Sequence, residues 1–405
     1  MAKGIPSFSG TRLRQARQAR GLSGVNLAAL LNTPEFAVST STISQYEHGE
    51  TKPPAETVER LAKALNVPKP FFLRPPFEYK TPRFFYRSMS SATKMARNRA
   101  ESRFEWLREI AAYFEEYFDL PEVNLPKFDL PSSFDLITED FIDKCAAECR
   151  RHWGLKDGPI PNMVRLLEKN GVVVSRFRLE AESLDAFSEV DSDQRPFVIL
   201  NADKESCARS RFDAAHELAH IIFHHGVEQR HLLSTQEHAK LEAQAHRFAV
   251  AFLLPESDFC RELAAPTLES FCALKERWRV SIAAMIVRCK QLGMLGPQHY
   301  ERLWMNLGRR GWRKCEPLDD QLQIEQPRLI RQCVDMMVDA RFKSRQQIAE
   351  DLCLFSADIE DLGGLPAGFL NDGFGDIITL EFKNQDSAKP QSEGSLGDVV
   401  PFKFA

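Results

Sequence analysis

The chain has 405 residues, of which 43% are hydrophobic, so it is long enough to bury a core in two or three domains of ordinary size. No apolar run reaches the length of a membrane span, and the first twenty residues lack the apolar stretch of a signal peptide, so we expect a cytoplasmic protein with no membrane partner. The nine cysteines contain no CxxC pair, which favours reduced thiols over a disulfide framework.

Charge is distributed unevenly along the chain. The net charge is -4, yet residues 1–100 carry sixteen Lys and Arg against six acids, a net charge of +10, which leaves -14 on the remainder. Because phosphate contacts favour clustered positive charge, a basic head on an acidic body indicates a nucleic-acid-binding module joined to a non-binding one. The alternative is a solvated basic surface, and only a motif can decide between the two.

Apolar residues repeat at helical spacing over residues 8–68, which predicts a bundle of short helices closed by a proline-rich stretch near residue 70. Gly21 ends one helix and Ser23 can cap the next, while the segment 39–49 is typical of a recognition helix. We therefore predict a helix-turn-helix DNA-binding domain over residues 8–73. The side chains expected to reach base edges or phosphates are Thr40, Ser41, Thr42, Ser44 and Gln45, with Arg12, Arg14, Arg17 and Lys52 on the flanking backbone.

Two points stay open for this domain. A capped helix rich in serine and threonine could serve protein contacts instead of DNA, and residues 33–37 lengthen the turn between the two helices, which leaves the docking angle undetermined. Domains of this type usually bind as dimers at paired half-sites, so we expect a homodimer.

Beyond residue 73 the pattern predicts a mainly α protein with a small β-sheet. Residues 74–135 form a linker flanked by prolines, with a long helix at about 90–118. Residues 136–256 read as helix, then strands, then helices, and residues 257–363 as a helical C-terminal region. Residues 364–405 form a tail, partly extended or flexible, with possible strands at 377–382 and 399–404.

A candidate metal site begins with His216, Glu217 and His220. Histidines at i and i+4 lie on one face of a helix, so both imidazoles can reach one ion, and the intervening Glu217 suits a general base for water activated by zinc. This HExxH spacing arises often by chance and needs a third ligand. Seven of the ten histidines lie between residues 216 and 246, which argues against an incidental helix pair.

The third ligand follows by elimination. Position 226 holds Gly226 where a metzincin has histidine, and His224 lies about 12 Å along the helix axis from His216 at 1.5 Å rise per residue. The next predicted helix offers Glu242 and His246 on one face. We favour Zn²⁺ held by His216, His220 and Glu242, with His246 as a neighbour outside the ligand set; His246 as the ligand is the alternative.

The surroundings of this site suggest its substrate. His231 and His238 are expected in a loop or on the surface, where either could polarise a substrate carbonyl. The strand at 197–200, just before the metal-binding helix, is expected to be an edge strand that pairs with an extended peptide. The substrate is then a polypeptide rather than a small ester.

The chain resembles two known families joined in one protein. Residues 10–73 look like the XRE (lambda-repressor-like) helix-turn-helix family through the segments 17–23 and 41–50. Residues from about 155 to 256 look like the ImmA/IrrE metallo-endopeptidases, with a zincin-like α+β fold, through the segments 211–224 and 242–255. In that family the Glu at the position of Glu242 is the third ligand, which supports the elimination independently. This chain departs at Ala219, where glycine is common, and at His246, where Asn or Asp is common.

This resemblance implies cleavage or inactivation of a repressor during DNA damage, prophage induction or mobile-element transfer. We thus expect a DNA-binding transcriptional regulator fused to a zinc endopeptidase that acts on a repressor, an antitoxin or another regulatory protein in a stress or defence response. The alternatives are a non-catalytic transcription factor with a ligand-sensing domain, and a toxin or defence effector that represses its own promoter. Residues 344–362 echo a second helix-turn-helix, but their four acids would repel phosphate, which favours packing or protein contact.

Overall fold

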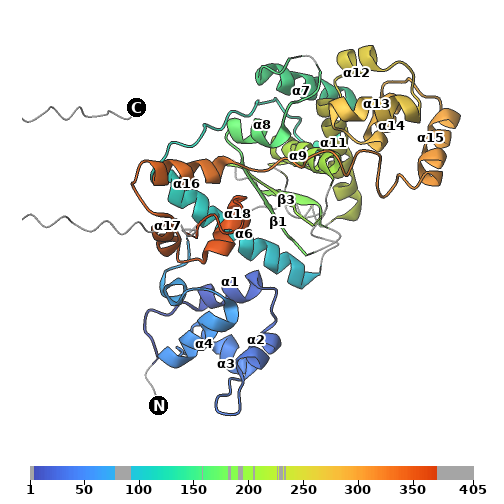
Figure 1. The fold of residues 1–405 in the computed structure, drawn as a ribbon. Coiled ribbons are helices and arrows are strands. Elements are labelled where there is room, and N and C mark those ends of the chain that lie inside the picture. Colours follow the sequence, from blue (N-terminus) through green and yellow to red (C-terminus); the bar gives the residue numbers. More distant parts are fainter. Residues whose placement is uncertain are drawn as a thin grey trace, which may run out of the picture.

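The computed structural model describes residues 4–77, 93–156, 158–180, 184–189, 195–203, 206–225, 227, 231 and 234–371. It is mainly helical with one small sheet, as the sequence predicts (Figure 1). The first half of the chain contains α1 Gly10–Ala19, α2 Gly24–Leu31, α3 Thr40–His48, α4 Ala55–Leu65, η1 Lys69–Leu73, α6 Lys94–Glu115, η2 Phe134–Leu136, α7 Glu139–His152 and α8 Met163–Lys169. Then follow β1 Val173–Phe177, β2 Ala186–Glu189, β3 Phe197–Asn201, α9 Cys207–Phe223, α11 Thr235–Leu253, α12 Glu256–Glu262, α13 Leu268–Trp278, α14 Ile282–Gln291, α15 Pro297–Arg309, α16 Leu329–Asp339, α17 Arg345–Leu352 and α18 Ser356–Gly363.

The three strands form a mixed sheet in the order β1-β3-β2. β1 runs parallel to β3, with Val173 opposite Phe197, and β2 runs antiparallel to β3, with Ser188 opposite Val198. The strand at 197–200 is therefore the central strand, and the prediction that it is an edge strand was wrong. Burial and alternation predict that a segment is extended, but they do not say which strands become its neighbours.

Helices cover both faces of this sheet. Alternate strand residues belong to two separate hydrophobic clusters: Val174 and Val198 pack with α8, α9 and α11, whereas Val173, Phe187 and Ile199 pack with α6 and α18. Figure 1 shows α8 and α9 on one side of the strands and α6 and α18 on the other. The helix that carries His216 and His220 is thus seated on a rigid, fully buried sheet.

The long helix predicted at about 90–118 is α6, and it is packed on two sides rather than lying in a free linker. α6 lies between α1 of the N-terminal bundle and the sheet: the ring of Phe104 packs edge-on against Phe197 at 5.3 Å, and Trp106 packs edge-on against Phe71 at 5.6 Å. Arg12 of α1 pairs with Glu109 of α6. The N-terminal bundle is consequently joined to the rest of the chain through a buried interface.

The C-terminal helices pack beside α6, on the same face of the sheet. Arg20 bonds to Asp358 at 2.6 Å through two parallel contacts, Arg103 pairs with Asp361, and Ser175 of β1 donates to the carbonyl oxygen of Leu362. The acids of residues 344–362 thus serve packing, as expected from their charge. The possible strands at 377–382 and 399–404 lie outside the described residues. Among the helices that the structure describes, none combines the length and the apolar character needed to cross a bilayer.

Candidate functional site

α9 places the three residues of the HExxH segment together. Ser206 caps the start of the helix by accepting a hydrogen bond from the backbone N–H of Arg209, and the apolar side of the helix packs into the core. His216 and His220 are one turn apart, and their Nε2 atoms lie 3.0 Å from each other. Both rings therefore present a nitrogen to the same point.

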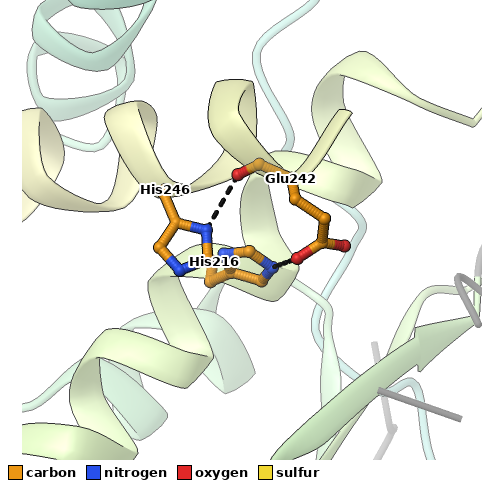
Figure 2. Close-up of side chains that lie close together, drawn as sticks. All are labelled: His216, Glu242 and His246. Atoms are coloured by element: carbon orange, nitrogen blue, oxygen red, sulfur yellow. Dashed lines mark hydrogen bonds and ion pairs between the residues drawn. The ribbon is translucent and has the colours of Figure 1, made fainter. Parts of the chain in front are cut away.

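α11 brings Glu242 to that point, as Figure 2 shows for Glu242 and His216. One carboxylate oxygen lies 3.3 Å from Nε2 of His216 and the other 3.4 Å from Nε2 of His220. Bonds of about 2.0–2.2 Å to a tetrahedral zinc place neighbouring ligand atoms about 3.3–3.6 Å apart. The two distances from Glu242 to the histidines fall in this range and the distance between the two histidine nitrogens is 3.0 Å, so the three side chains can converge on one metal ion.

The protonation of these three residues also suits a cation. Burial acts to raise the pKa of Glu242, but the interactions with the two neighbouring imidazoles, that of His216 first, outweigh it and hold that pKa well below its ordinary value. Burial lowers the pKa of His220 to about 4. Burial acts to lower the pKa of His216 as well, but its bond and charge interaction with Glu242 outweigh this and raise it. An ionised carboxylate thus sits among imidazoles, and a bound cation would replace the proton that His216 otherwise attracts.

Glu217 reaches from α9 to the sheet. Its Oε2 accepts a hydrogen bond of 2.6 Å from the hydroxyl of Ser188 on β2. Burial raises the pKa of Glu217 to about 7, although the charge of His216 and the bond from Ser188 both lower it. A carboxylate whose pKa is close to neutral is suited to take up and return a proton. Ser188 was not singled out by the sequence, because no local pattern relates a residue on β2 to a glutamate 29 residues further along the chain.

The other histidines of the region are placed as follows. His246 is exposed, its Nδ1 donates to the carbonyl oxygen of Glu242 at 2.8 Å, and its ring lies 4.6 Å from that of His216 (Figure 2). His216, Glu242 and His246 each have a possible ligand atom within 4.8 Å of the others. His231 bonds to Glu237 at 2.9 Å. His238 is buried on α11, 3.9 Å from Glu242, which corrects the expectation that it lies in a loop or on the surface.

His224 is the residue whose importance sequence reasoning missed. Its distance from His216 along the helix excluded it as a ligand. The structure places it behind His220, fully buried, with its Nδ1 2.8 Å from the Nδ1 of His220. The signal was in the sequence, since His220 and His224 repeat the i, i+4 spacing of His216 and His220.

The recognition helix α3 presents its polar side chains to solvent. Ser39 caps it, and Gly49 ends it with a φ of 74°, a left-handed conformation that favours glycine. Ile43 and Tyr46 are buried on the opposite side. The predicted DNA-contacting residues of α3 are exposed, with Thr42 half-buried: Thr40, Ser41, Thr42, Ser44 and Gln45.

The four basic residues expected on the phosphate backbone divide into two groups. Arg12 is 1% exposed and donates two hydrogen bonds to Glu109, so it is not presented to DNA and its predicted phosphate contact is wrong. Arg17 is held by a bidentate pair with Glu47 at 2.6 and 2.9 Å. Arg14 keeps 42% of its side chain exposed, and Lys52 lies at the surface with its amine on the carbonyl oxygen of Phe8. Arg14 and Lys52 therefore remain the better candidates.

Comparison with known families assigns both parts of the chain. Residues 13–72 match the family described as Helix-turn-helix, and residues 167–290 match the IrrE N-terminal-like domain, a peptidase family. The two matches confirm the fusion that the sequence predicts. A search of curated proteins found none that matches the chain.

Proposed function

Because the chain joins a helix-turn-helix DNA-binding domain to a domain of the IrrE peptidase family, we propose that it is a DNA-binding regulator with a zinc endopeptidase activity. The observation that carries this proposal is the convergence of His216, His220 and Glu242 at 3.0–3.4 Å, with Glu217 buried beside them. Two imidazoles and one carboxylate are the donor set of a hydrolytic zinc site.

Each residue then has a defined task. His216, His220 and Glu242 would hold Zn²⁺, which supplies a Lewis acid that polarises the scissile carbonyl and makes water more acidic. Glu217 takes the proton from the attacking water and returns it to the leaving amine, which requires a pKa near the working pH. The hydroxyl of Ser188 holds the Glu217 carboxylate in one orientation. His246 stays outside the ligand set and orients its neighbours from the surface side.

The position of β2 indicates how a polypeptide would lie. This outer strand carries Ser188 to Glu217, so a segment of substrate that runs alongside β2 would cross the site next to the general base. An extended peptide can use main-chain hydrogen bonds in this position, whereas a small ester cannot. We therefore place the substrate along β2 rather than along the central strand β3.

The joined DNA-binding domain suggests the identity of the substrate. A peptidase held at an operator meets other regulators of the same DNA at high local concentration. We propose that it cleaves a repressor, an antitoxin or a related regulatory protein in the cytoplasm, as part of a stress, prophage or defence response, and that the chain acts as a homodimer on paired half-sites.

Replacement of Glu242 by alanine tests the metal centre. Changes outside a ligand set typically weaken metal binding 10- to 100-fold, so loss of a ligand is expected to weaken zinc binding at least about 100-fold. Competition with a chromophoric chelator measures this affinity, and peptide cleavage should fall with zinc occupancy. The control is Glu237→Ala on the same helix, which removes a half-buried carboxylate bonded to His231. Equal zinc affinity of Glu242→Ala and wild type would refute this ligand set.

The DNA interface makes a second prediction, with sites first selected by the wild-type chain from random duplexes. Gln45→Ala removes a side chain that can reach a base edge, and it is expected to cost about 1–3 kcal/mol on the selected site with little effect on unrelated DNA. Arg14→Ala removes a phosphate contact, so it should weaken both equally and reduce the salt dependence by about one charge. Binding titrations at several salt concentrations measure both, and identical losses on both duplexes for Gln45→Ala would contradict base readout.

A further inference from the structure

A chain of buried hydrogen bonds leads away from the candidate metal centre. Nδ1 of His220 lies 2.8 Å from Nδ1 of His224, Nε2 of His224 lies 3.0 Å from Oε1 of Gln244, and Nε2 of Gln244 donates to the carbonyl oxygen of Phe134 at 2.7 Å. The four groups come from α9, the C-cap residue that follows it, α11 and η2. His224 is fully buried, and His220 and Gln244 are nearly so.

The direction of these hydrogen bonds follows from the last member. The carbonyl oxygen of Phe134 can only accept, so the amide of Gln244 must face it with its NH₂ group. Oε1 of Gln244 therefore faces His224, and because this oxygen can only accept, Nε2 of His224 carries a proton.

The next step sets the tautomer of His220. A fully buried ring bonded to a neutral amide favours the neutral form, which has one proton and one lone pair. With its proton on Nε2, His224 accepts at Nδ1, so Nδ1 of His220 must donate. Neutral His220 then has its lone pair on Nε2, the nitrogen that faces His216 and Glu242. The opposite tautomer would put two lone pairs against each other at 2.8 Å in a buried site.

We propose that His224 and Gln244 are positioning residues that hold His220 in the tautomer whose Nε2 lone pair points at the metal, before any metal arrives. Histidine ligands generally need a partner on their other nitrogen, most often a carboxylate or a backbone carbonyl. Here a second histidine takes that place. The backbone carbonyl of Phe134, which can only accept, fixes the proton positions of Gln244 and His224 and through them that of His220. This inference rests on the proposed function, since it assumes that His220 is a zinc ligand.

Nitrogen NMR of the metal-free, full-length chain labelled with ¹⁵N-histidine tests the tautomers directly. Long-range couplings from the ring carbons' protons distinguish a protonated nitrogen from one with a lone pair. We expect His220 protonated at Nδ1 and His224 protonated at Nε2. A His220 ring protonated at Nε2 in the wild type would overturn the proposal, whether or not the chain cleaves peptides.

Zinc affinity of variants provides the second readout. His224→Ala is expected to weaken zinc binding about 10- to 100-fold, and Gln244→Leu less, because His224 stays present but loses the acceptor that fixes its proton. His225→Ala is the matched control, since His225 is the same residue type one position along and should leave the affinity unchanged. In Gln244→Leu the NMR signals of His220 should show a mixture of tautomers. Unchanged zinc affinity in His224→Ala would overturn the positioning role, and because binding is measured without substrate, this outcome is separate from any failure of peptidase activity.

Discussion

A chain that carries Glu217→Gln is expected to bind zinc with wild-type affinity and to cleave peptides about 10²- to 10⁴-fold more slowly, the range typical for loss of a general base. Glutamine has nearly the same shape and can still accept the hydrogen bond from Ser188, so the fold and the ligands should be undisturbed. What it cannot do is take a proton from water. Cleavage of an unstructured peptide library, followed by mass spectrometry, measures the loss.

The same variant separates the peptidase from the non-catalytic, ligand-sensing alternative. Glu237→Gln on α11 makes the same chemical change at a half-buried carboxylate that is bonded to His231 and should leave cleavage intact. If Glu217→Gln retains full cleavage, the mechanism is wrong. If wild type and Glu217→Gln both fail to cleave any peptide while the DNA affinity of both changes with zinc occupancy, the domain senses a ligand instead. A fragment found only in cells that express the wild type would identify the substrate.

The second large effect is expected in stability, at Glu325. One oxygen of this buried carboxylate pairs with Arg211, and the other accepts hydrogen bonds from the backbone N–H groups of Met163 and Val164 at the start of α8. Arg211 also donates to the carbonyl oxygen of Ile160 at 2.6 Å. The side chains of the pair are 1% and 3% exposed, so Glu325→Ala leaves a buried guanidinium and two backbone donors without their acceptor. We expect a loss of about 3–5 kcal/mol in the free energy of unfolding.

Chemical denaturation followed by circular dichroism measures this loss. Glu269→Ala is the matched control, because it breaks an ion pair with Arg310 that is largely exposed, and solvent screening should make its effect too small to resolve. Replacing both members of the buried pair, Arg211→Met with Glu325→Leu, is expected to be less harmful than Glu325→Ala alone, since no charge is left unpaired. If Glu325→Ala unfolds like the control, the pair is not a determinant of stability.

The location of this pair gives it a link to function. Arg211 lies five residues before His216 on α9, and Glu325 belongs to the segment between α15 and α16. The C-terminal region thus helps to fix the helix that carries the candidate ligands. Glu325→Ala is therefore expected to weaken zinc binding as well, in parallel with the loss of stability.

Local patterns in the sequence were sufficient for features that depend on neighbouring residues. A helix puts positions i and i+4 on one face whatever surrounds it, so the common direction of His216 and His220 could be predicted without tertiary information. Serine caps and a glycine in the left-handed conformation are equally local, and the predicted ends of α3 at Ser39 and Gly49 agree with the structure.

Contacts between distant segments were decided only by the tertiary structure. From the sequence, Arg12 cannot be told from an exposed arginine of a basic helix. In the structure α6 covers it and places Glu109, 97 residues away, against its guanidinium. The strand at 197–200 became central because β1 and β2 pair on its two sides, which alternation cannot encode. The sequence gives no role to His224. In the structure it contacts His220, and α11 brings Gln244 within hydrogen-bond distance of its other ring nitrogen. Helical periodicity in the sequence determined which residues share a face. The partners of each face were decided only by tertiary packing, because they depend on contact energies between segments that are distant in the sequence.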